Sequence, residues 1–400
     1  ENGEYPRLGD LLKQSKIAAG SAMNAQKFIL IGDPAMQLAY PELKVETTQF
    51  NGEPINQSGD TIRALDFVTI SGRVYDDNGK TANSFNGVVY PTIYDKPSQM
   101  TSLGNDDNSS PFDFEQMNRI LYRGQAEVID GEFSFSFQVP KDINYSFGNG
   151  KISYYVSDEF TDGNGYDDHF IIGGFNNSNQ SDEQGPEIKL FINDPYFSNG
   201  GLTNSDPLIY AEIFDESGIN VGTGIGHDIT AVLDSNYDKI YVLNDFYQGA
   251  LNSYQAGTVE YPLFNLAPGA HTLELKVWDA LNNSSTAQIS FVVAGENDVI
   301  LDNLNCYPNP FSASTKIFFE HNQSGEMLTM DYMIFDFSGR LVFDRTVTEE
   351  TKGYRTSSVT WNGTNNSGSY LPGGIYICKL IVTNEEGVSS AVTGKFVLTR

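Results

Sequence analysis

The chain has 400 residues, and 52 Asp and Glu against 24 Lys and Arg give it a formal net charge of −28. An acidic chain of this kind repels phosphate backbones, so nucleic-acid binding is disfavoured. Hydrophobic residues make up 39% of the sequence, which is enough to build packed cores, and the length predicts about three domains. No apolar run reaches the roughly 18 residues that a membrane-spanning helix needs.

Residues 1–42 are predicted to form a short α/β unit. Leu8, Leu11 and Leu12 have helical spacing, and Gly20 offers a C-terminal stop. The continuous apolar run 28–31 is typical of a strand that is buried on both faces of a sheet. A helix followed by such a strand cannot bury itself alone, and residue 1 opens no signal peptide. We therefore expect a mature protein or a fragment, with further chain upstream.

Residues 43–182 are predicted to form a β-sandwich of the Ig-like or carboxypeptidase-regulatory-like type. Apolar and polar residues alternate along 133–139, which places four apolar side chains on one face of a strand. Asp130-Gly131 predicts a tight hairpin before this strand, and 69–75 predicts another strand. The polar stretch 98–111 is expected to be a long mobile loop. The following residues 112–121 fit either a helical turn or a docking segment.

Residues 183–295 and 296–400 are each predicted to form an Ig-like β-sandwich. In the first of these units, strands are expected at sandwich spacing, for example over 208–214, 228–233, 239–243, 258–264, 273–277 and 287–293. The last unit begins at the segment Cys306–Phe311, whose two prolines exclude a central strand. Alternating segments over 374–380 and 394–398 follow. The predicted fold class is mainly β, with tandem Ig-like sandwiches after the short α/β unit.

A nucleophilic Cys/His site would need a thiol beside a histidine base. Cys378 lies between Tyr376 and Leu380 in a predicted strand, and Cys306 has no cationic cluster nearby, so both are expected to be structural. Whether the two cysteines form a disulfide is left open. We therefore predict no catalytic residue among the cysteines and the four histidines His169, His227, His271 and His321.

Two further stretches have the composition of binding loops. Asp162, Asn164 and Asp167 are a weak calcium candidate, because Tyr166 interrupts the oxygen-ligand pattern of an EF-hand, and a solvated acidic loop is the alternative. The glycine-rich stretch 222–228 is followed by a predicted strand and lacks the Lys-Ser/Thr pair of a phosphate-binding loop. No cofactor is expected, and the 22 tyrosines are attributed to strand composition rather than to a sugar-binding platform.

Several of these stretches resemble one protein family. Lys27–Pro41 is similar to the end of the peptidase domain of gingipain-like C25 cysteine peptidases, which have a caspase-like fold. Three stretches, 217–234, 242–247 and 271–285, are similar to one domain of the type IX secretion-system sortases of that family. The segment 306–311 and the strands after it resemble the C-terminal sorting domain of type IX cargo.

The resemblance implies a cysteine peptidase on the bacterial cell surface, at the outer face of the outer membrane. It implies removal of C-terminal signal domains from exported cargo, with transfer to a lipopolysaccharide anchor, and a catalytic His and Cys upstream of residue 27. This chain would be the scaffold and docking half, held by an outer-membrane β-barrel protein of the PorV type. The partner-binding residues implied are Gly339, Gly374, Tyr376 and Lys395.

Two alternatives remain open at this point. Lys395 on a terminal strand could simply prevent edge-to-edge aggregation. The whole chain could instead be a non-enzymatic surface adhesin, or an array of glycan-binding modules, exported by the same route.

Overall fold

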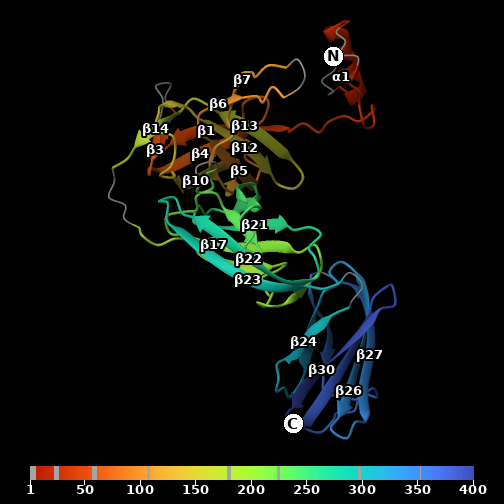
Figure 1. Ribbon diagram of the computed structural model, residues 1–400. Coiled ribbons are helices and arrows are strands. Elements are labelled where there is room, and N and C mark those ends of the chain that lie inside the picture. The colour runs from red at the N-terminus through yellow and green to blue at the C-terminus, as the bar shows by residue number, and fades with distance from the viewer. Residues whose placement is uncertain are drawn as a thin grey trace.

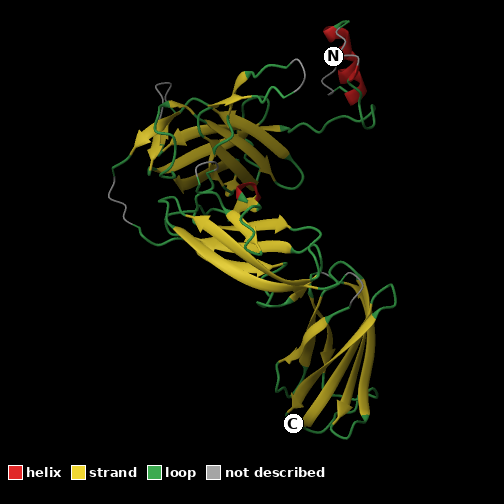
Figure 2. Cartoon of the chain, viewed as in Figure 1, coloured by secondary structure: helices red, strands yellow, loops and turns green. Residues whose placement is uncertain are grey.

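The computed structural model describes residues 6–21, 27–55, 61–105, 109–177, 182–222, 226–295, 299–351 and 353–400. The chain is mainly β, as predicted, and forms three β-rich bodies, each with its own hydrophobic core (Figure 1). The helix at the N-terminal end lies apart from these bodies, and nearly all other regular structure is strand (Figure 2). In the described residues, no helix has the length and hydropathy that a membrane span requires.

The N-terminal segment contains the predicted helix, α1 (Leu8–Ala19), which ends at Gly20 with a φ of 61°. None of the helix residues is buried, and the N–H groups of Leu8 and Gly9 donate to the carbonyls of Met36 and Pro34. The buried strand expected over 28–31 needs a sheet around it, and no described strand supplies one. This run is not a strand, and Phe28, Ile29 and Ile31 are 67, 75 and 90% exposed.

The first body is built on one sheet that closes on itself. Its ring runs through β12 (Lys151–Ser157), β13 (Asp162–Asp167), β1 (Leu43–Phe50), β4 (Phe67–Tyr75), β10 (Glu132–Gln138), β9 (Ala126–Ile129) and β5 (Gly87–Tyr94). The ring closes because β5 also pairs with β12, with Val88 opposite Ser157 at one end and Tyr94 opposite Lys151 at the other. This closed sheet differs from the two-sheet sandwich expected for 43–182. An alternating pattern predicts one buried face in both architectures, whereas closure depends on pairing between distant strands.

Short strands accompany the ring: β8 (Ile120–Arg123) and β2 (Glu53–Pro54) extend it, and β3 (Thr61–Ala64), β11 (Gly148–Asn149) and β14 (Ile171–Phe175) form a small separate sheet. The predicted hairpin between β9 and β10 is confirmed, with Asp130 and Gly131 both at positive φ. The loop expected over 98–111 begins with a strand, and its described residues 102–105 and 109–111 are loop; the helical turn, one of the two alternatives for 112–121, does not form. These residues instead contain β6 (Ser98–Thr101) paired with β7 (Asp113–Gln116), followed by β8.

The second body is a two-sheet sandwich, as predicted. One sheet contains β15 (Glu187–Ile192), β17 (Leu208–Phe214), β21 (Ala256–Pro262) and β20 (Tyr247–Gly249); the other contains β16 (Leu202–Thr203), β23 (Ser284–Val293), β22 (Gly269–Trp278), β18 (Thr230–Leu233) and β19 (Ile240–Val242). A short 3-10 helix, η1 (Asn244–Phe246), precedes β20. Alternate residues of both sheets, such as Ile209, Leu275 and Phe291, meet in the core.

The third body is also a sandwich. A three-stranded sheet of β24 (Leu301–Tyr307), β25 (Thr315–His321) and β28 (Arg355–Trp361) packs on a four-stranded sheet of β27 (Leu341–Glu350), β26 (Met327–Asp336), β29 (Gly374–Thr383) and β30 (Ser389–Leu398). Large fully buried side chains, including Trp361, Tyr332 and Phe396, fill the space between the sheets. The core therefore reaches nearly to the C-terminus of the chain.

Polar contacts join the first and second bodies. His227 Nδ1 lies 2.9 Å from Asp142 Oδ2, and Asn220 Nδ2 donates to Asp142 Oδ1 at 3.2 Å. The backbone N–H of Lys141 donates to the carbonyl of Ala280 at 2.8 Å. The His227 ring also packs edge-on against Trp278. Within the glycine-rich stretch 222–228, residues 223–225 lie outside the described residues, and His227 contacts Asp142 across the junction.

Candidate docking surface

The outer face of the third body's four-stranded sheet carries a row of exposed apolar side chains next to a lysine. Leu341, Phe335, Ile377 and Lys395 lie in register across β27, β26, β29 and β30. Leu341 is 46% exposed and Ile377 is 38% exposed, while Ile375, one position along the same face, is 46% exposed. We call these five residues the C-terminal sheet face. Such a patch on a sheet whose other face is the core is typical of an interaction surface.

Lys395 and Gly374 are placed where a partner could reach them. Lys395 is exposed on β30 and makes no ion pair with any carboxylate in the described part of the chain. Gly374 begins β29 at the same end of the sheet. A Cβ at Gly374 would meet nothing within 4 Å, and its φ is not in the left-handed region, so neither space nor backbone conformation requires glycine here.

Gly339 and Tyr376 have local structural roles instead. Gly339 has a φ of 81° in the turn between β26 and β27, where the Asp336 carboxylate accepts the N–H groups of Ser338 and Arg340. Tyr376 is 3% exposed, with its ring against Trp361 and its hydroxyl donating to the Pro372 carbonyl at 2.7 Å. Tyr376 can therefore support the sheet from within, but it cannot touch a partner directly. Partner binding itself stays a prediction.

The segment 306–311 covers the edge of β30. Asn309 Nδ2 donates to the Lys395 carbonyl at 3.0 Å, and the Val397 N–H donates to Asn309 Oδ1 at 2.9 Å. The Phe311 N–H adds a bond to the Val397 carbonyl at 3.0 Å. One asparagine side chain thus takes the place of a neighbouring strand. These backbone groups of β30 are therefore already bonded and are not open to pairing with another strand.

The calcium candidate does not converge on one point. Residues 162–167 form β13 rather than a loop, so Asp162 and Asn164 lie on one face of the strand and Asp167 on the other. The Cα atoms of Asp162 and Asp167 are about 16 Å apart at strand spacing. Asp167 is buried and accepts the His169 N–H at 2.9 Å. This set of three residues is therefore wrong as a shared site.

A different group of carboxylates lies close together in the second body. Oxygens of Asp182, Asp215 and Asp279 lie within 4.8 Å of one another. Burial raises the pKa of Asp215 to about 7 and also raises the pKa of Asp279, whereas the hydrogen bond from Ser217 lowers the pKa of Asp182. Sequence analysis missed the group because its members come from three separate segments. Their oxygens already accept bonds from nearby loop groups, so the cluster joins these loops.

The cysteines and histidines show no nucleophilic arrangement within the described residues. Cys306 and Cys378 are free thiols buried in the third core, and burial raises the pKa of Cys378 to about 12. Burial lowers the pKa of His321 to about 4, and its Nε2 lies 3.0 Å from Thr356 Oγ1. His271 lies 2.8 Å from Asp234 on the surface of the second body. These groups therefore have structural contacts rather than catalytic ones.

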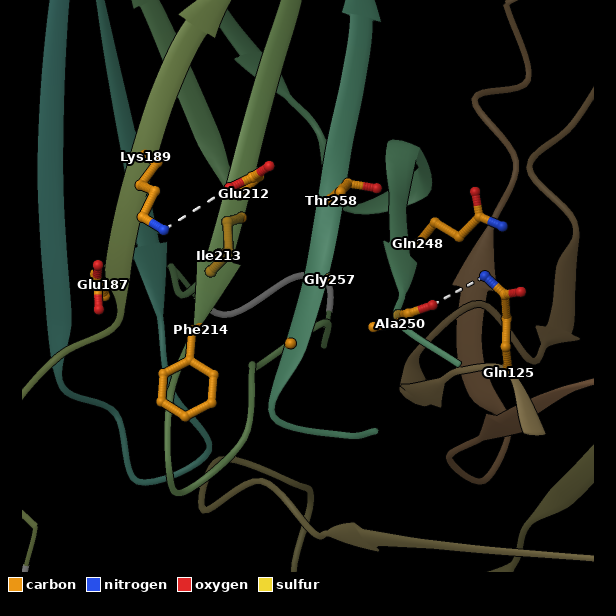
Figure 3. A pocket seen from close by; sticks show the side chains of 12 residues that line it. Gln125, Glu187, Lys189, Glu212, Ile213, Phe214, Gln248, Ala250, Gly257 and Thr258 are labelled. Carbon is orange, nitrogen blue, oxygen red and sulfur yellow. Dashed lines mark hydrogen bonds and ion pairs between the residues drawn. The ribbon is translucent and has the colours of Figure 1, made fainter. Parts of the chain in front are cut away.

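A cavity of about 610 Å³ lies where the sheet containing β15, β17, β21 and β20 meets the first body (Figure 3). Lys189 Nζ is 3.9 Å from Glu212 Oε2, and Gln125 of the first body donates to the Gly249 carbonyl at 2.9 Å. Phe214 contributes an apolar ring to the lining. The lining is mixed: Glu187, Glu212 and Lys189 are charged, Ile213 and Phe214 are apolar, and it contains no thiol or histidine.

No protein-family model and no curated protein matches the chain. Among solved structures, the chain is 30% identical to dimeric latent PorU from Porphyromonas gingivalis over 100% of its own length and 38% of that protein's length, with a TM-score of 0.41. Two others are a tetra-tandem repeat of a large adhesion protein (14% identical, 90% of this chain and 74% of that one) and the FN1–FN3 domains of chicken CNTN1 (10% identical, 85% and 96%). Their TM-scores are both 0.21.

The sequence identity, rather than the superposition, connects this chain to PorU. It extends over all 400 residues, so it includes the N-terminal helix segment and all three β-rich bodies. The chain spans well under half the length of that protein. The chain is therefore similar to PorU in sequence over its whole length.

Proposed function

We propose that this chain is the C-terminal scaffold and docking half of a type IX secretion sortase. The observation that carries the proposal is the 30% identity to PorU along the whole chain, at 38% of that protein's length. The sortase would remove C-terminal signal domains from exported cargo at the outer face of the outer membrane. Its Cys-thiolate chemistry, and the transfer of cargo to a lipopolysaccharide anchor, would reside in a peptidase domain that these residues support.

The C-terminal sheet face is the proposed contact with an outer-membrane β-barrel protein of the PorV type. Its apolar row offers a surface that a partner can cover, and Lys395 beside the row would pair with an acidic group on the partner. At the end of β30 that carries Lys395, the edge is covered, which leaves side chains rather than unpaired backbone as the means of recognition there. We therefore expect a side-chain interface and no added strand at β30.

The exposed apolar run 28–31 is the proposed contact with the peptidase domain. Ile31 is 90% exposed and Ile29 is 75% exposed, an arrangement that is unfavourable in water. The start of α1 is tied by backbone hydrogen bonds to the residues that follow this run. Packing into the sheet of a caspase-like domain would bury both the helix and the run.

A pull-down of outer-membrane proteins tests the proposal. The full chain should recover a β-barrel protein, and the same chain lacking residues 300–400 should lose it. Recovery of the same partners after the truncation would refute docking through the third body. Recovery of host glycoconjugates, with no β-barrel partner, would favour the adhesin alternative.

A further inference from the structure

A second cavity lies between the second and third bodies and has an unusual lining. Its volume is about 700 Å³. Tyr196 and Asp194 contribute from the segment after β15, and Tyr307, Lys316, Phe318 and Arg355 contribute from β24, β25 and β28. The cavity therefore combines three aromatic rings with two cations and one carboxylate. It lies away from the C-terminal sheet face, on the opposite sheet of the third body.

The Arg355 guanidinium is turned toward aromatic rings rather than toward an acid. The Arg355 guanidinium carbon lies 4.2 Å from the centroid of the Phe318 ring and 5.7 Å from that of Tyr196. Neither Arg355 nor Lys316 makes an ion pair with a carboxylate of the described chain, although acidic residues outnumber basic ones by 52 to 24. Guanidinium groups stack on aromatic faces and bind carboxylates or phosphates with two parallel hydrogen bonds. The cavity is thus a positive site in a strongly negative molecule.

The rings are exposed and available for stacking. Tyr307 is 76% exposed and Tyr196 is 71% exposed. Asp194 Oδ1 accepts the Tyr196 N–H at 2.8 Å, which holds this carboxylate at the rim. A carboxylate at a site of positive charge can accept hydrogen bonds from ligand hydroxyls while the cations bind an acidic group. A ligand that matches all three features has a flat apolar face, several hydroxyls and a negative charge.

We propose that this cavity binds an acidic saccharide, meaning a sugar that carries a carboxylate or a phosphate group. The sugar ring stacks on Tyr307 and Tyr196, its acidic group binds Arg355 and Lys316, and its hydroxyls donate to Asp194. A simple anion has no face that could stack on the exposed rings of Tyr307 and Tyr196. This inference goes beyond docking to a β-barrel and does not depend on it, since the two surfaces share no residue.

Calorimetric titration of the full chain with trigalacturonate, at low ionic strength, tests the proposal. The neutral trisaccharide maltotriose is the matched ligand. Arg355→Ala and Lys316→Ala should each weaken trigalacturonate binding by about tenfold or more, since each removes a charged hydrogen-bond donor. Tyr307→Ala should weaken it through lost stacking. Arg345 is an exposed cation on β27 of the four-stranded sheet of the same body, so Arg345→Ala should leave trigalacturonate binding unchanged.

Several results would overturn the proposal. Equal binding of maltotriose would remove the role of the cations, and equally tight binding of inorganic phosphate would reduce the site to a simple anion site. Tighter binding of a tri-glutamate peptide would make the ligand an acidic peptide. Unchanged binding by Arg355→Ala, in a variant whose Tm equals that of the parent chain, would place the ligand elsewhere.

Discussion

Replacement of Asn309 by alanine should release the edge of β30. The side chain makes two hydrogen bonds to the backbone of that strand, at 3.0 Å to the Lys395 carbonyl and at 2.9 Å from the Val397 N–H. Each such bond contributes about 0.5–1.5 kcal/mol net, so the loss of both should cost roughly 1–3 kcal/mol of unfolding free energy. Asn309→Asp keeps the acceptor for Val397 but loses the donor to Lys395. It should therefore cost about half as much.

Hydrogen exchange at single amides is the appropriate assay, with urea unfolding for the total free energy. Asn309→Ala should speed exchange of the Val397 amide, and Asn309→Asp should leave that amide protected. Ser312→Ala is the control, because no hydrogen bond of its hydroxyl is recorded and the residue is exposed at the end of the same segment. Unchanged protection of Val397 in Asn309→Ala would refute the idea that one side chain replaces a neighbouring strand.

Two further predictions concern the first and second bodies. Burial raises the pKa of Asp215 from its ordinary 3.8 to about 7. The contribution of Asp215 to the unfolding free energy is therefore full below about pH 4 and is lost as the pH rises through about 7. Asp215→Asn should remove this pH dependence, which urea unfolding at about pH 5 and about pH 8 measures. Equal pH dependence in both proteins would contradict the assignment. Gly131→Ala should destabilise the chain by more than Gly79→Ala, because both glycines have φ near 78° but only at Gly131 would the new Cβ lie 2.7 Å from the Ala82 carbonyl oxygen. Urea unfolding gives the loss of unfolding free energy in each variant. Equal losses would show that the positive φ alone, and not the contact with Ala82, determines the destabilisation.

Strands with strict alternation were predictable because their pattern has only one structural solution. The strand over 208–214 agrees with β17, and the Asp130-Gly131 turn forms as expected, since both depend on neighbouring residues alone. The stretch 98–121 was misjudged, because its polar residues carry no alternation, yet β6 and β7 still pair. The run 28–31 is apolar but forms no strand in the described chain, since an apolar composition makes a buried strand only where partner strands exist.

Features that join distant segments could not be predicted from the sequence. The closure of the first sheet depends on β5 meeting β12, and the cluster of Asp182, Asp215 and Asp279 depends on three loops meeting. The cavity around Arg355 likewise needs the second and third bodies to lie against each other. Of the residues carried over by resemblance, Lys395 and Gly374 lie where a partner could touch them, whereas Tyr376 is buried.

The affinity of the chain for an outer-membrane β-barrel protein of the proposed PorV type, measured by biolayer interferometry with point variants, tests the central claim most directly. Ile377→Glu places a charge in the middle of the apolar row and should weaken binding by about tenfold or more. Ala391→Glu adds the same charge on the same face of β30, away from the row, and should change binding little. Equal affinities for the two variants and the parent chain would contradict docking through the C-terminal sheet face.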